Sequence, residues 1–263
     1  MEMILQSFPV FLLIFCRITS FFVVVPVFST RGVPMQFRVG IAAVLSILIY
    51  LTFGIKEQVP ADLSYALLVI REVMIGLLLG FVAYLMFMAI QTAGSFIDIQ
   101  IGLGIASVFD PMTGASVPIT GNFKYTIALL FFLSMNGHHY LLDAIMYSYN
   151  WVPLDNDFFV KLYGGSISEF IIRTFSQSFL LAFQMAAPIV VATFLTDVGL
   201  GFLAKTAPQF NIFVIGVPVK LIVGLIMLFL LMPALAVSFE RLFNVMFEAM
   251  RTLLDVVGSR PNA

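Results

Sequence analysis

Several ionisable side chains of this sequence lie inside long apolar stretches, where a charge is costly. Arg17 and the adjacent pair Arg71–Glu72 are such residues. An ionisable residue within an apolar span indicates, by default, a proton or ion relay. The alternative is a charge buried against protein, which we favour for these three residues. The other charges lie near the ends of apolar stretches, where pairing or contact with water is favoured: Asp143, Arg173, Asp197 and Lys220.

No catalytic motif accompanies these charges. The sequence has no GxSxG nucleophile turn, no HExxH zinc helix and no GxxxxGK[ST] phosphate loop. His138 and His139 are the only histidines, and neighbours on a helix point about 100° apart, which does not suit one metal ion. We therefore expect no enzyme activity, no metal and no cofactor.

The composition indicates a membrane protein. Of 263 residues, 61% are hydrophobic and 10% are charged, and the mean hydropathy is +1.08. A soluble domain carries about 25% charged residues, so this chain has too few polar atoms to cover a water-facing surface. The net charge of −1 gives no indication of a nucleic-acid partner, and Cys16, the single cysteine, excludes an internal disulfide.

Six apolar stretches must position these residues. They run over 3–25, 39–55, 67–97, 125–149, 170–195 and 212–237. Most have the ~20 residues that a spanning helix needs, and the strand alternation of a membrane barrel is absent. The sequence therefore predicts an all-α membrane protein of about six long hydrophobic helices. With six spans, Lys and Arg number five on one side and four on the other, which slightly favours cytoplasmic termini.

The stretch 67–97 is too long for a straight crossing. At ~1.5 Å per residue it extends ~45 Å, whereas the hydrocarbon layer is ~30 Å thick, so we expect it to tilt, bend or extend beyond the bilayer. One face carries small and polar residues at helical spacing: Glu72, Gly76, Gly80, Ala83, Gln91, Gly94 and Asp98. Small residues let another backbone approach closely. This stripe indicates either packing within one chain or an interface between subunits.

An apolar segment rich in Gly and Pro follows, over 102–121. It has four glycines, two prolines and one charge, Asp110, whereas an exposed loop is normally more polar. One interpretation is a re-entrant loop packed in its own subunit. The other is a flexible stopper inside a passage, sealed by Val108, Phe109 and Met112, because a methionine side chain adapts to an irregular opening.

Four segments together carry a family resemblance. They are Arg71-Glu72 with Gly76 and Gly80, the run 98–104 leading into Phe109-Asp110-Pro111, Asn136-Gly137-His138, and the run 207–218. In combination they resemble the FliR family of flagellar export-gate proteins, whose injectisome counterpart is called SctT. The likeness covers nearly the whole chain, and 208–218 is its most specific part.

The resemblance implies a division of the chain and a set of partners. Residues 1–165 would be a FliP-like helical part with a plug loop at 104–121, and 166–263 would be a FliQ-like helical hairpin with a cytoplasmic tail. The helices would be bent hairpins, embedded with FliP and FliQ in a helical export-gate assembly. FlhB and FlhA would lie on the cytoplasmic side.

The resemblance also implies a function. The chain would be a subunit of the flagellar type III export gate, in the bacterial inner membrane at the flagellar basal body, and unfolded flagellar subunits would cross through the channel. The alternatives are an injectisome export-gate subunit and, from a different class, a small-solute or ion transporter.

The expected site residues fall into three groups. The plug comprises Val108, Phe109, Asp110, Pro111 and Met112; helix packing or a subunit interface involves Glu72, Gly76, Gly80, Asp98, Pro208, Gln209, Gly216 and Pro218; the buried charges are Arg17 and Arg71.

Overall fold

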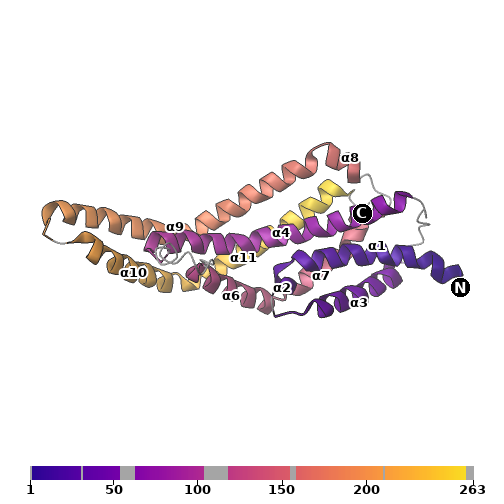
Figure 1. Ribbon diagram of the computed structural model, residues 1–263, viewed down its shortest axis with the longest axis horizontal. Helices are drawn as coiled ribbons and strands as arrows, with labels where there is room; N and C mark the ends of the chain where they lie inside the picture. The colour runs from indigo at the N-terminus through magenta and orange to yellow at the C-terminus, as the bar shows by residue number, and fades with distance from the viewer. Residues whose placement is uncertain are drawn as a thin grey trace. The chain divides into compact units, whose positions relative to one another are not determined.

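The computed structural model of the chain describes residues 2–30, 32–53, 63–103, 118–154, 158–209 and 211–258. In these ranges all regular secondary structure is helical (Figure 1). The prediction of an all-α membrane protein is confirmed. The described ranges contain ten helices, however, and not about six, because two of the predicted stretches each divide into two helices and short helices occur in the connections.

The first half of the chain is dominated by one very long helix. α1 (Glu2–Val24), the single turn α2 (Pro26–Ser29) and α3 (Met35–Phe53) come first, and α1 and α3 lie side by side (Figure 1). α4 (Leu63–Ile101) then runs without interruption for 39 residues. At ~1.5 Å per residue it is ~58 Å long, so it exceeds the ~30 Å hydrocarbon layer by more than the sequence predicted.

The predicted stretch 125–149 divides into α6 (Ile119–Ser134) and α7 (Gly137–Trp151). The break is at Asn136, whose φ of 57° is left-handed. Asn is one of the few residues that adopt this conformation readily, and a single left-handed residue ends a right-handed helix. The short helix α8 (Phe158–Tyr163) follows.

The C-terminal part contains three long helices. α9 (Ser166–Thr206) has 41 residues, and α10 (Ile212–Leu230) and α11 (Met232–Val257) together replace the predicted stretch 212–237. α10 and α11 meet at a bend of 65°. Pro233 explains this break, because a proline in the first turn of α11 has no N–H to donate to the preceding turn.

Three of the described helices are long and apolar enough to cross a membrane: α3, α4 and α9. The bent pair α10–α11 makes a fourth candidate if it is counted as one span. The apolar parts of α1 and α6, Phe8–Val24 and Ile119–Ser134, are shorter than the ~20 residues that span a bilayer. The described residues thus offer three or four candidate spans where the sequence suggested six.

The chain groups into two compact units that do not follow the order of the sequence. Unit 1 comprises Met1–Leu85, Asn136–Thr174 and Val245–Ala263, and unit 2 comprises Met86–Met135 and Phe175–Asn244. The helices α4, α9 and α11 therefore each contribute to both units. The division at residue 165 into FliP-like and FliQ-like parts is a statement about likeness to other chains, and it stays a prediction.

Each unit has an apolar core. In unit 1 the core includes Leu13, Ile14 and Ile145, which are fully buried. In unit 2 the rings of Phe87 and Phe132 each contact the ring of Phe243, at centroid distances of 5.5 and 4.8 Å. Aromatic pairs at such distances add to the free energy gained from burial alone.

Candidate functional site

A charge cluster lies in the core of unit 1, where α1 faces α4. Arg17 Nε donates to Glu72 Oε2 at 2.6 Å and Arg17 Nη2 donates to Glu72 Oε1 at 3.0 Å. Both side chains are fully buried. The guanidinium fork matches the two carboxylate oxygens, and such bidentate, charge-assisted pairs are the stronger class of hydrogen bond.

The other side of Arg17 faces α7. Its Nη1 donates to Ser148 Oγ and its Nη2 to the carbonyl of Val152, both at 3.0 Å. The Tyr149 ring lies 3.9 Å from the guanidinium carbon, a cation–π geometry. Burial raises the pKa of Tyr149, so the phenol is neutral beside the cation. Arg17 thus joins three helices that are far apart in the sequence.

Arg71 completes this cluster. It is 2% exposed, and its Nη2 and Nε donate to Glu72 Oε1 at 2.9 and 3.3 Å. The carboxylate of Glu72 therefore accepts hydrogen bonds from two arginines. Both oxygens of this carboxylate are thus held by fixed arginine donors. The arrangement suits a fixed structural joint better than the proton relay that is the default for charges in apolar spans.

Glycines of α4 let α1 approach next to the charge cluster. A Cβ placed on Gly76 would lie 2.1 Å from both the carbonyl oxygen of Arg17 and the Oγ of Ser20, and a Cβ on Gly80 would lie 2.9 Å from the Cβ of Val24. The first distance is far too short for real atoms. The small residues that the sequence analysis noted thus form a seam that α1 of the same chain occupies.

In unit 2 the seam continues along α4 and faces α6. A Cβ on Gly94 would lie 2.0 Å from the Cα of Gly121. One turn further along, the carboxylate of Asp98 accepts a hydrogen bond from the Oγ1 of Thr120 at 2.7 Å and from its backbone N–H at 3.2 Å. Glu72, Gly76, Gly80 and Asp98 thus each contact another helix of the same chain.

The remaining predicted positions lie around the hairpin of α9 and α10 in unit 2 (Figure 1). Pro208 and Gln209 are exposed in the turn between these helices, and Pro218 is exposed within α10. Gly216 is buried, and a Cβ there would lie 3.3 Å from Leu200 of α9. Gly216 therefore packs the hairpin, while the other three positions are open to lipid or a partner.

Asp197 joins the same hairpin to α4. Its Oδ1 pairs with the Nζ of Lys220 at 2.8 Å, and its Oδ2 accepts a hydrogen bond from Gln100 Nε2 at 3.3 Å. The pairing matches the expectation for charges near the ends of apolar stretches. Arg173 also has a partner, Glu169, at 2.7 Å on the surface.

The plug residues lie outside the described residues: Val108, Phe109, Asp110, Pro111 and Met112. The described flanks of that segment are Ile101 to Leu103 on one side and Pro118 to Gly121 on the other. The hydrogen bonds between Asp98 and Thr120 join the helix before this segment to the helix after it.

Sequence reasoning missed four residues of these joints: Ser148, Tyr149, Thr120 and Lys124. The first three are neutral, and nothing in their spacing marks them as partners of a distant charge. Lys124 lies directly before the predicted stretch 125–149, and its side chain in α6 is 1% exposed. Its position within an apolar helix was a signal that could have marked it.

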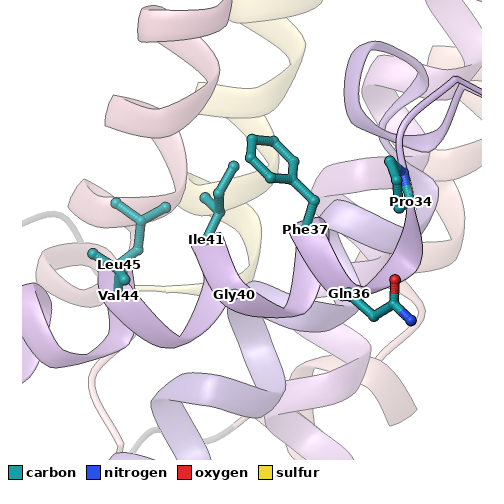
Figure 2. Close-up of a pocket in the computed structure, with 7 residues that line it drawn as sticks. All are labelled: Pro34, Gln36, Phe37, Gly40, Ile41, Val44 and Leu45. Carbon is teal, nitrogen blue, oxygen red and sulfur yellow. The ribbon is translucent and has the colours of Figure 1, made fainter.

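A shallow apolar groove lies on one face of α3. Figure 2 shows the side chains of Phe37, Ile41 and Leu45 projecting from this face at successive turns, with Gly40 between them. A Cβ on Gly40 would have no neighbour within 4 Å. Only 17% of the candidate span in α3 is buried, so a bilayer or a partner must cover this face.

Comparison with known proteins was consistent with these features. Residues 8–246 match the family described as bacterial export proteins, family 1. The flagellar biosynthetic protein FliR of Bacillus subtilis (strain 168) is 45% identical over 258 residues, which cover 98% of this chain and 99% of the relative. The FliR of Escherichia coli (strain K12) is 30% identical, with 93% of this chain and 91% of the relative covered. The Yop proteins translocation protein T of Yersinia pestis is 31% identical, with 83% and 84% covered.

Proposed function

This chain belongs to the bacterial export proteins of family 1, and from that membership we propose that it is a subunit of the flagellar type III protein export gate. In this proposal it forms, with FliP and FliQ, the channel through which unfolded flagellar subunits cross the bacterial inner membrane. FlhB and FlhA adjoin it on the cytoplasmic side at the flagellar basal body.

The observation that carries the proposal is likeness along the whole chain. The similarity to the Bacillus subtilis FliR covers almost all of both chains, so the likeness is not confined to one segment. The identity to that flagellar protein is also higher than the identity to the Yop translocation protein. This difference favours a flagellar gate over an injectisome gate.

The physical features of the chain support a passive role in an assembly. The buried charges Arg17, Arg71 and Glu72 are paired with one another in a joint between helices. Many large apolar side chains remain uncovered, among them Phe179, Phe183 and Phe202 at 51 to 69% exposure. Ion pairs of this kind fix the positions of the helices and do not act in a reaction. A surface with so many exposed apolar side chains needs lipid or sister subunits around it.

The segment 104–121 is proposed as the plug of this channel. It is apolar, carries the single charge Asp110, and has Gly and Pro at intervals that disfavour a continued helix. Val108, Phe109 and Met112 would seal the opening when nothing passes, which limits the leakage of ions. Packing at the flanks, as between Gly94 and Gly121, would hold the base of the segment in place.

A pull-down from membranes tests the proposal. The chain carries an affinity tag in the flagellated bacterium that encodes it, the membranes are extracted in a mild detergent, and the retained proteins are identified by mass spectrometry against an untagged strain. We expect FliP and FliQ to be strongly enriched over the untagged strain. A stable, isolated chain that transports a small solute in liposomes would instead support the transporter and contradict the export gate.

A further inference from the structure

Lys124 is a buried cation for which the described residues provide no hydrogen-bond acceptor. It lies in the second turn of α6, its side chain is 1% exposed, and no acceptor among the described residues lies within hydrogen-bonding distance of its Nζ. An ammonium group loses its hydration when buried, so burial without an acceptor is strongly unfavourable. Native proteins keep few such groups, and each one calls for an explanation.

Asp98 is the acidic side chain that acts on Lys124 electrostatically, but it is already occupied. Its carboxylate accepts hydrogen bonds from the backbone N–H and the hydroxyl of Thr120. Asp98 thus caps the first turn of α6 from α4, in place of Pro118, whose side chain offers no cap. The carboxylate of Asp98 therefore accepts from Thr120 in this structure, and Lys124 is a second possible donor to it.

The hydroxyl of Thr120 can give up Asp98 and still keep an acceptor. Its Oγ1 lies 2.7 Å from Asp98 Oδ1 and 2.9 Å from the carbonyl oxygen of Gly94. A hydroxyl has one proton to donate, so it serves one of these two acceptors at a time. If Asp98 turns away, the hydroxyl of Thr120 still has the Gly94 carbonyl as its acceptor.

The position of Lys124 on the helix suits it to replace Thr120. The two residues are four apart and share a face of α6, as both are buried. Side chains on a helix point toward its N-terminus, so the Lys124 side chain extends toward the turn that holds Thr120 and Asp98. This direction brings the ammonium group toward the carboxylate that acts on it electrostatically.

We propose that Asp98 exchanges between Thr120 and Lys124. In one state, seen here, Asp98 caps α6 and Lys124 has no acceptor among the described residues. In the other state Asp98 and Lys124 form an ion pair, the Thr120 hydroxyl donates to Gly94, and the first turn of α6 has lost its cap. The junction of α4 and α6 is then an element with two discrete arrangements, whatever function the chain serves.

A sign reversal tests this exchange. The chain is purified with the partners that remain bound, and the melting temperature is compared for Lys124→Met in the native background and in Thr120→Val. In the native background we expect Lys124→Met to raise the melting temperature, since it removes a cation without an acceptor. In Thr120→Val we expect it to lower the melting temperature by several degrees, since Asp98 has then lost its hydroxyl donor and Lys124 can replace it.

The control is Lys205→Met, the same chemical change at an exposed position of α9, which should have a small effect of equal size in both backgrounds. An effect of Lys124→Met with the same sign in both backgrounds would overturn the proposal.

A second measurement uses the native protein and does not depend on how well the variants fold. An apolar carbodiimide joins a carboxylate to an amine in direct contact, forming an amide with the loss of one water, and peptide mapping locates the link. We expect an Asp98–Lys124 link in the native chain and several-fold more of it in Thr120→Val. The ion pair Asp197–Lys220, at 2.8 Å, is the internal control. If that control link forms, the proposal fails when the Asp98–Lys124 link is absent or when its yield is the same in both proteins.

Discussion

Arg17 of α1 and Glu72 of α4, 55 residues apart in the sequence, share two hydrogen bonds in a fully buried part of unit 1. The same guanidinium reaches Ser148 and the carbonyl of Val152. One side chain therefore fixes the spacing of α1, α4 and α7, three helices that no short connection holds together.

Removing either charge of this pair should destabilise the chain severely. Glu72→Gln leaves the buried cations Arg17 and Arg71 without their anion, and loss of one partner of a buried pair costs about 3–5 kcal/mol. We expect a much lower melting temperature in detergent and little chain in the membrane. Arg173→Met is the control, because its pair with Glu169 is exposed at 78% and 65% and such pairs contribute about 0–1 kcal/mol. Equal effects of the two changes would contradict the role of the cluster.

A single methyl group on the seam should separate α1 from α4. Gly76→Ala places a Cβ 2.1 Å from the backbone carbonyl oxygen of Arg17, and backbone on both sides must move, which costs about 1–3 kcal/mol. The matched control is Gly40→Ala, in a helix of the same unit where no atom lies within 4 Å. Thermal unfolding of the two variants should show a loss for Gly76→Ala and almost none for Gly40→Ala. An unchanged melting temperature for Gly76→Ala would show that α1 and α4 can move apart at this position without loss of stability.

Tyr149 should make the stability of the chain fall at high pH. Burial raises the pKa of Tyr149 in the folded state, whereas a tyrosine in the unfolded chain ionises near pH ~10. Above that pH the unfolded chain releases a proton that the folded chain retains, so the free energy of unfolding decreases by ~1.4 kcal/mol per pH unit. Its dependence on pH should be flatter above pH ~10 in Tyr149→Phe. Denaturant titration from pH 8 to 11 gives the free energy of unfolding of the native chain and of Tyr149→Phe, and the difference between them reports the ionisation of Tyr149. Parallel curves for the two chains would contradict this role of Tyr149.

Deletion of Ser107 to Ser116 should make the assembled gate leak ions. The segment is proposed as the stopper of the channel, and without it an open passage is left while no substrate passes. Ion conductance of membranes that contain the complete gate is the measurement, with expression of the complex verified by pull-down. As a control, Val108 and Phe109 are each exchanged for leucine, which preserves an apolar seal. Unchanged conductance after the deletion would show that the segment does not close the channel.

The fold class could be predicted from the sequence because it depends on composition. An excess of apolar residues in long runs requires helices whose backbone groups are paired internally. The number of helices could not be predicted, since it depends on single residues. Asn136 ends α6 by its left-handed conformation, in a short polar run inside the predicted stretch. Pro233 divides α10 from α11, although the apolar pattern continues through that position.

The partners in the candidate site could be predicted only in part. The stripe on α4 was visible because its period is that of a helix, and buried charge at Arg17 and Arg71 followed from the cost of exposure to lipid. Which helix covers the stripe depends on tertiary packing, and the seam with α1 over Gly76 has no counterpart in local spacing. Thr120 and Tyr149 were missed because a neutral side chain carries no sign of a charged partner far away in the sequence.

The interleaving of the two units has a consequence for synthesis on the ribosome. Unit 2 ends at Asn244, but unit 1 requires Val245–Ala263 as well as the first residues of the chain. The unit that begins first is therefore completed last, and α1 must wait for the end of α11 to emerge. Neither unit can be expressed as a contiguous fragment, because each is built from separate segments, and three of the four boundaries between them lie inside α4, α9 and α11.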